Sequence, residues 1–191
     1  MQIIPHVIEK IGRSEKPIDL PSRLLQDRIV YLGDGVDAFA ANIIIMQLLW
    51  LNANDPDADI DFYINSPGGS VYDGLAIKDI IDSIDAPVNT IGIGICMSMG
   101  AFLLSAGTGE RKAMPNCRIM IHSVSSGAGG TYHDMAIDFE EAKYLQDKMM
   151  EYSATNTKGK TSLEDIIELS KRDKYMSPEE AIELGLIDKV V

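Results

Sequence analysis

The stretch TIGIGICMSMGAFLLSAG, residues 90–107, decides the fold of this 191-residue chain. No charged residue occurs between positions 86 and 109, so a membrane span has to be considered first. A spanning helix needs about 20 predominantly apolar residues, and here three glycines and Ser98 interrupt the run. Glycine alternates with isoleucine in the first half, which predicts a buried strand, whereas Met99–Ala106 predicts a buried helix that ends at Gly107. We therefore expect a strand, a sharp turn and a helix.

Ser98 lies at that turn, where two roles are open to it. A serine at a helix start commonly accepts hydrogen bonds from the first free amides and so caps the helix, which is the more common role. It can also be a nucleophile, because the partial positive charge of a helix N-terminus favours a developing oxyanion. Small neighbours (Gly94, Gly100 and Ala101) would let another backbone, such as that of a substrate, approach closely.

Composition limits the classes of protein to which the chain can belong. Its length suits one domain, and 46% hydrophobic and 24% charged residues are ordinary values for a globular protein. The net charge of −12 argues against a nucleic-acid partner. Cys96 and Cys117 lack metal-ligand spacing, so we expect reduced thiols of a cytosolic protein and no metal site. The N-terminus lacks the basic start and apolar core of a signal peptide.

Predicted strands and helices alternate along the chain, which indicates a mostly parallel sheet with right-handed crossovers. Residues 1–20 show no long period and are expected to form an arm that needs a partner surface for its order, with a single domain over 21–191. The predicted strands are 29–32, 60–65, the first half of the quoted stretch, 118–121 and the last residues. The predicted helices are 38–52, 71–84, 99–106, about 132–155, 163–169 and one that begins after Ser177.

The helix predicted at about 132–155 is long for a domain of this size. It carries an apolar stripe with helical spacing, which is usually core. Because the helix exceeds twenty residues, we expect it to project and to pack against a copy of itself. The stripe consists of Met135, Phe139, Ala142, Leu145, Met149 and Tyr152.

Chemistry is expected beyond the carboxyl ends of the strands, where parallel sheets bind ligands. Gly68-Gly69, Ser98 and His122 each follow a predicted strand and should face one cleft. The glycine pair offers free amides for a phosphate or an oxyanion, but no Gly-Lys-Ser/Thr follows, which excludes a nucleotide P-loop. A serine, a histidine and two amides favour acyl transfer. Spacing alone cannot select the orienting acid among so many carboxylates.

Four segments together resemble one family. YINSPGG (63–69), SMGAFLLSAG (98–107), PNCRIMIH (115–122) and KRDKYMSPEEA (171–181) are similar to the proteolytic subunit of the Clp protease, ClpP, a serine peptidase, and the similarity extends from about residue 4 to the C-terminus. The resemblance implies an α/β fold of the ClpP/crotonase type, with the long helix as a projecting handle. It also implies that Ser98 is the nucleophile, His122 the general base and Asp173 the orienting acid. The main-chain amides of Gly69 and Met99 match the family's oxyanion hole.

The resemblance further assigns residues that bind substrate and a partner. Substrate would pair as a strand with the Gly-rich segment after His122, and an unfoldase loop would insert an apolar side chain near Tyr63. Asp61 and Ser83 stand near that docking position where relatives often have aromatic residues, which predicts weak docking of a standard unfoldase. The residues expected to bind the substrate strand are Gly68, Ser123, Val124 and Ser125.

Assembly and location are likewise implied by the resemblance. The family forms two stacked seven-membered rings that enclose the active sites and are fed by an AAA+ unfoldase, so residues 1–20 would be an axial arm. This chain would form such a homo-oligomer or pair with a paralogous ring, in the cytoplasm, on polypeptide substrates. It would need no cofactor, since only the partner unfoldase uses ATP, and neither nucleic acid nor membrane is expected as a partner.

Two other functions remain open. The first is a crotonase-type acyl-CoA enzyme, a class that shares the fold, the paired glycine-turn amides and an ending like AIELGLIDKVV, but needs neither the serine at the turn nor the MIH that follows. The second is a catalytically silent ring subunit. The presence of Ser98, His122 and Asp173 argues against silence, and labelling of Ser98 by a fluorophosphonate would separate the peptidase from both.

Overall fold

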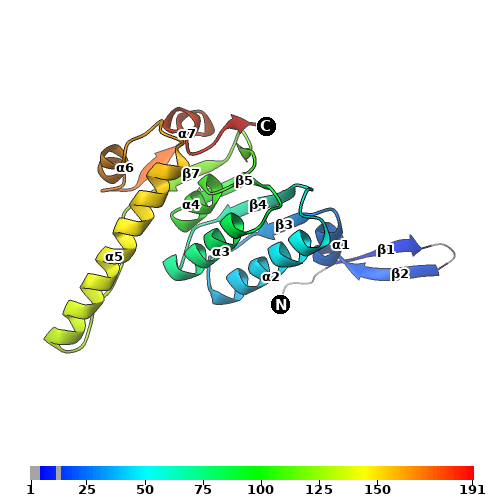
Figure 1. Ribbon diagram of the computed structural model, residues 1–191, viewed down its shortest axis with the longest axis horizontal. Helices are drawn as coiled ribbons and strands as arrows, with labels where there is room; N and C mark the ends of the chain where they lie inside the picture. The colour runs from blue at the N-terminus through cyan, green and yellow to red at the C-terminus, as the bar shows by residue number, and fades with distance from the viewer. Residues whose placement is uncertain (1–4, 12–13) are drawn as a thin grey trace.

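A computed structural model describes residues 5–11 and 14–191 and contains a seven-stranded sheet (Figure 1). Five strands follow the order β3-β4-β5-β6-β9, while β7 pairs with β5 and β8. All pairs in this sheet are parallel except β7–β8. The predicted mostly parallel α/β fold is therefore confirmed. The strands are β3 (Ile29–Leu32), β4 (Ile60–Ser66), β5 (Val88–Met97), β6 (Arg111–Ala113), β7 (Arg118–Ile121), β8 (Lys174–Met176) and β9 (Lys189–Val190).

Most helices begin at a side chain that accepts a hydrogen bond from the first turn. Six of the seven described helices have this cap, with Asp, Ser or Thr at the capping position; the exception is α4. Helix α7 ends at Gly185, its C-cap, which has the left-handed conformation that glycine adopts readily. The helices are α1 (Leu20–Gln26), α2 (Ala38–Asn54), α3 (Val71–Ser83), α4 (Met99–Ser105), α5 (Tyr132–Asn156), α6 (Leu163–Leu169) and α7 (Pro178–Leu184).

Strand β4 has one fully buried face and one partly exposed face. Ile60, Phe62 and Ile64 are inaccessible to solvent, whereas Asp61 and Tyr63 between them are only half-buried. The buried face belongs to the main core, together with apolar residues of α2, α3 and α4. Helix α2 is apolar nearly all round, yet within this chain it buries one side and leaves Phe39, Met46, Leu49 and Trp50 substantially exposed.

Helix α5 projects away from the rest of the molecule (Figure 1). Its predicted apolar stripe divides into two parts. Leu145 and Met149 are buried, whereas Met135 and Phe139 are 40% and 72% exposed. Only the C-terminal half of the stripe therefore packs within the chain, and the N-terminal half is apolar surface.

The N-terminal arm forms a hairpin, which the sequence reasoning did not foresee. Strand β1 (His6–Ile11) pairs antiparallel with β2 (Ser14–Asp19), and it lies at the opposite end of the molecule from α5 (Figure 1). Charges and Pro17 obscure the strand alternation in this segment. Residues 1–4 and 12–13 of the predicted arm lie outside the described residues.

The stretch at 90–107 folds as a strand, a turn and a helix, as predicted, but the helix end was wrong. Helix α4 ends at Ser105 and Ala106 is its C-cap. Gly107 serves packing instead, since a Cβ there would lie 2.9 Å from the carbonyl oxygen of Val88. Within the described residues, no helix is both long and apolar enough to cross a membrane.

Candidate active site

Ser98 joins β5 to α4 in an unusual backbone conformation. Its φ and ψ are 52° and −120°, a sparsely populated region that costs a non-glycine residue on the order of 1–3 kcal/mol. The main chain is held firmly, because the Ser98 amide donates to the carbonyl of Met120 at 2.8 Å and Phe102 donates to the carbonyl of Ser98 at 3.0 Å. The Ser98 side chain makes no capping hydrogen bond. The interpretation of Ser98 as a plain helix cap is therefore wrong, and its hydroxyl is free for another role.

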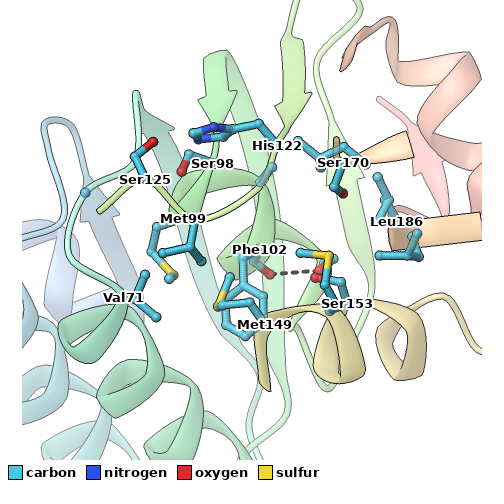
Figure 2. Close-up of a pocket in the computed structure, with 17 residues that line it drawn as sticks. Val71, Ser98, Met99, Phe102, His122, Ser125, Met149, Ser153, Ser170 and Leu186 are labelled. Carbon is cyan, nitrogen blue, oxygen red and sulfur yellow. Dashed lines mark hydrogen bonds between the residues drawn. The ribbon is translucent and has the colours of Figure 1, made fainter. Parts of the chain in front are cut away.

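His122 reaches Ser98 because two strands run parallel. Met97 of β5 pairs with Met120 of β7, so the residues that follow each strand meet at one edge of the sheet. Both side chains line the same cavity, and the imidazole of His122 lies beside Ser98 (Figure 2). The predicted meeting of these two residues at one cleft is confirmed.

Asp173 is brought to His122 by a strand that the sequence reasoning missed. In the antiparallel pair β7–β8, Ile121 is opposite Lys174, so the next residues, His122 and Asp173, face each other. Nδ1 of His122 and Oδ1 of Asp173 are 3.9 Å apart, and the side chain of Asp173 is 60% exposed. This separation exceeds a hydrogen bond, although such contacts are often long in unliganded enzymes. The acid thus faces the ring nitrogen that a triad requires, in an open arrangement.

The glycine pair is held tightly against the serine turn. Gly68 and Gly69 have φ values of 101° and 152°, which favour glycine. A Cβ on Gly68 would lie 2.7 Å from that of Ser98, and one on Gly69 would lie 2.1 Å from the carbonyl oxygen of Val36. Val36 fixes the loop, since its amide donates to Gly68 and its carbonyl accepts from Ser70, both at 2.8 Å. The sequence reasoning did not identify Val36, which looks like an ordinary turn residue.

Two main-chain amides beside Ser98 are left without an acceptor. Neighbouring amides are engaged, because that of Gly68 donates to Ser66 Oγ at 3.1 Å and that of Ser98 to Met120. Those of Gly69 and Met99 donate to no acceptor among the described residues, and both residues line the cavity. This pair of donors could stabilise an oxyanion.

A cavity of about 150 Å³ adjoins Ser98 and His122 (Figure 2). Most of its wall is apolar, and α5 supplies part of it through Met149 and Met150. A cavity of this character accepts an apolar side chain of a bound peptide. The apolar residues that line it are Val71, Met99, Ala101, Phe102, Ile121, Val124, Met149, Met150, Ile166 and Leu186.

The segment after His122 runs between the two helices α3 and α5. Val124 is anchored to α5, since its amide donates to Oε1 of Gln146 at 2.6 Å, and the hydroxyl of Ser123 donates to the carbonyl of Ser170 at 2.9 Å. Val124 and Ser125 line both the catalytic cavity and a second, more polar cavity. Of the residues predicted to bind a substrate strand, Val124 and Ser125 therefore lie along both cavities, whereas Gly68 and Ser123 line neither of the two.

The three docking residues do not form one site within a single chain. Asp61 and Tyr63 share the partly exposed face of β4, and Asp61 accepts a hydrogen bond from Nδ2 of Asn89 at 3.0 Å. Ser83 is the last residue of α3, whose Ile77 and Ile81 pack in the core against the other face of the sheet. Any pocket that unites them would need a second chain.

The two cysteines come together in the core, and both are free and buried. Their Sγ atoms are 3.8 Å apart. The contact with the Cys117 thiol, together with burial, raises the pKa of Cys96. Within the described residues, no group of three or more His, Cys, Asp or Glu side chains is placed to hold a metal ion.

Comparison with known proteins agrees with the motifs. The model of the family described as Clp protease matches residues 12–191. A relative from Prochlorococcus marinus (strain NATL2A), named ATP-dependent Clp protease proteolytic subunit 1, is 48% identical over 98% of this chain and 95% of its own length. A relative from Deinococcus radiodurans, named ATP-dependent Clp protease proteolytic subunit, is 46% identical over 100% of this chain and 93% of its own. The chain belongs to the Clp protease family.

Proposed function

We propose that this chain is a serine endopeptidase in which Ser98 attacks the peptide carbonyl, His122 moves the proton and Asp173 orients the imidazole. The observation that carries the proposal is the Ser98 turn, where a strained backbone presents an uncapped hydroxyl beside His122 and two free amides. No other described helix start departs from side-chain capping in this way.

Acylation follows from the placement of these groups. His122 Nε2 takes the proton of Ser98 as Oγ bonds to the carbonyl carbon, and the oxyanion receives hydrogen bonds from the Gly69 and Met99 amides. The tetrahedral intermediate collapses when the C–N bond breaks and His122 gives its proton to the leaving amine. For this step Asp173 must approach Nδ1 more closely than the 3.9 Å separation, because it has to stabilise the imidazolium.

Deacylation repeats the sequence with water. His122 deprotonates a water molecule, whose oxygen attacks the ester carbon while the same two amides stabilise the oxyanion. Breaking the ester bond returns the proton to Ser98 and releases the carboxylic acid product. Apart from the substrate, the two steps use only side chains and amides of this chain and one water molecule.

The names of the relatives support a role in ATP-dependent proteolysis. In this proposal the substrates are unfolded polypeptides delivered by an AAA+ Clp ATPase, and short peptides without it, in the cytoplasm. Two stacked heptameric rings would cover the exposed apolar side chains of α2 and α5, such as Trp50 and Phe139, which are 50% and 72% exposed. ATP would be used only by the partner.

Docking of the ATPase would use the partly exposed face of β4. One row of paired residues crosses β3, β4, β5 and β6 and consists of Tyr31, Tyr63, Ile91 and Lys112. Its first three side chains are largely apolar, and Lys112 at its end is charged. Asp61 adds a second charge beside it. A standard apolar loop would therefore bind this homo-oligomer weakly, and a paralogous ring or a divergent partner would supply the missing apolar surface.

Fluorophosphonate labelling tests the catalytic proposal directly. The purified chain should be labelled at Ser98, as located by peptide mass spectrometry, and Ser98→Ala should abolish labelling. Ser162→Ala, which alters a helix-capping serine that does not line the cavity, is the matched control and should retain it. Absence of labelling at Ser98 in a chain that folds and assembles would contradict the peptidase. Binding of an acyl-CoA thioester would then favour the crotonase-type alternative.

A further inference from the structure

Three serines line the otherwise apolar wall of the catalytic cavity beyond the reactive end, and they differ in their hydrogen bonds. The hydroxyl of Ser105 is satisfied, because it donates to the carbonyl of Phe102 at 2.8 Å and accepts from Nδ2 of Asn156 at 3.0 Å. The hydroxyl of Ser153, on α5, makes no hydrogen bond to the described residues, whereas that of Thr155 on the same helix donates to the carbonyl of Glu151 at 2.9 Å. A helical serine that does not donate to the preceding turn presents its hydroxyl to its surroundings, which here include the cavity.

Ser153 and the reactive residues occupy opposite ends of the cavity. Figure 2 shows Ser98 and His122 at one end and Ser153 at the other, with Phe102 between them. Ser170 also lines the cavity, and its hydroxyl likewise makes no hydrogen bond to the described residues, but Ser170 is only 1% exposed, whereas Ser153 is partly exposed and so more accessible. Ser153 is therefore the polar group that an inserted side chain would meet after it had passed the apolar walls.

We propose that Ser153 determines specificity and favours tyrosine over phenylalanine at the residue whose carbonyl Ser98 attacks. This inference rests on the proposed peptidase function. The side chain of that residue enters the cavity beside Ser98, and its ring packs on Phe102, Met149 and Leu186.

The phenol suits the far end because it both donates and accepts a hydrogen bond, as the Ser153 hydroxyl does. Phenylalanine fills the same apolar space but leaves the Ser153 hydroxyl without a partner, after the substrate has excluded water. A lysine or arginine side chain would carry an uncompensated charge into the cavity, where no acidic side chain belongs to the wall.

Two fluorogenic peptides that differ only in Tyr or Phe at the cleaved residue would test the proposal, with the cleavage position checked by mass spectrometry. The assembled full-length chain should have a kcat/KM ratio (Tyr over Phe) of about 3 to 10, the value of one neutral hydrogen bond. In Ser153→Ala the ratio should fall to about 1, while Ser153→Thr, which keeps the hydroxyl, should retain the preference. Ser105→Ala is the matched control, because it removes a satisfied hydroxyl from the same wall and should not change the ratio.

The two proposals fail in different ways. If the unmodified chain hydrolyses neither peptide, the peptidase function is contradicted. If it hydrolyses both at equal efficiency, or if Ser153→Ala keeps the wild-type ratio, the role of Ser153 is overturned while the peptidase function stands. A Ser153→Ala chain that does not fold leaves two decisive measurements, the wild-type ratio and the ratio of Ser153→Thr.

Discussion

Two pairs of a basic and an acidic side chain, Arg111–Asp188 and His122–Asp173, differ in burial and in the distance between their charged groups. Arg111 is 2% exposed and meets Asp188 through two contacts, Nε to Oδ2 at 3.0 Å and Nη2 to Oδ1 at 2.5 Å. Its other donors reach the carbonyls of Ser105 and Asn156. His122 and Asp173, by contrast, are 3.9 Å apart, and the acid is 60% exposed.

The difference shows what each pair does. The Arg111–Asp188 pair ties β6 and the segment before β9 to the ends of α4 and α5, and it has no unpaired charge. The His122–Asp173 pair makes a much smaller contribution to the free energy of unfolding, because an exposed contact beyond hydrogen-bonding distance contributes little to stability. We call Arg111–Asp188 the closed pair, because its charges are fully hydrogen-bonded within the chain. We call His122–Asp173 the open pair, because its two side chains are not within hydrogen-bonding distance.

The strongest test of the open pair is catalytic. Ser98→Ala, His122→Ala and Asp173→Ala should each lower peptide turnover on the order of 10⁴-fold or more, and double variants should be no worse than single ones, because triad members act as a unit. Turnover of a fluorogenic peptide measures this, with preparations checked for contaminating peptidases. Near-normal turnover by Ser98→Ala would contradict the role of Ser98 as the nucleophile.

The closed pair should respond in stability instead. Asp188→Asn leaves the buried Arg111 charge without its partner, which should lower the free energy of unfolding by about 3–5 kcal/mol. Asp173→Asn, a change of the same kind at the open pair, should lower it by less than about 0.5 kcal/mol. Denaturant unfolding of the two variants measures the contrast. Equal destabilisation would show that the comparison is wrong.

The N-terminal half of the α5 stripe is apolar surface that the rest of the chain does not cover. Phe139→Asp would place an unpaired charge in the proposed contact between rings, at a cost of several kcal/mol, so the assembly should shift toward single rings with weaker activity. Sedimentation velocity measures the mass. Glu140→Asp on the same exposed turn is the control, and an unchanged mass for Phe139→Asp would mean that α5 does not join rings.

The pH dependence of stability should also reflect the closed Arg111–Asp188 pair. Hydrogen bonds from Arg111 lower the pKa of Asp188 far below its usual value, so its contribution to stability is fully present above the unfolded pKa, about 3.9. That contribution is lost as the pH falls from there through the depressed folded pKa. Between about pH 4 and pH 2 the free energy of unfolding of the wild type should fall more steeply than that of Asp188→Asn, by up to about 1.4 kcal/mol per pH unit. Parallel slopes would contradict the depressed pKa.

The docking face offers a test of binding in place of stability. Asp61→Tyr with Ser83→Phe should restore buried apolar area worth about 1.5–3 kcal/mol for a fully buried side chain, and so strengthen binding of a Clp ATPase to the assembled ring. Titration of both rings with the ATPase measures the difference. Tight binding by the unmodified ring, without gain in the variant, would show that the face already suffices.

The sequence predicted those parts of the site that local patterns control. Ser98, His122 and the glycine pair each follow a predicted strand, so their common edge followed from the alternation of parallel strands and helices. Asp173 could not be found in that way, because its position depends on β8, a strand of three residues with no periodicity to detect. Only the family resemblance pointed to it, and the register of β7 with β8 supplies the physical reason.

The remaining errors have two different origins. The hairpin at the N-terminus is a local pairing, with Ile11 opposite Ser14 and His6 opposite Asp19, but its charges and Pro17 obscure the strand alternation. The α5 stripe has one continuous pattern, yet only its C-terminal half meets the core, because the helix extends beyond the domain. Whether an apolar face meets core or a second chain depends on the length of the element relative to the fold, and not on its spacing.

The backbone of Ser98 also affects how the chain tolerates mutation. At φ 52° and ψ −120° glycine meets no steric resistance, while alanine retains the disfavoured Cβ. A glycine there would exchange on the order of 1–3 kcal/mol of strain for an entropic cost of about 0.5–1 kcal/mol, and so would give a more stable protein that, under the proposed mechanism, has no nucleophile. Selection for thermal robustness alone would thus favour loss of activity at this position, and only selection on turnover would keep the serine in place.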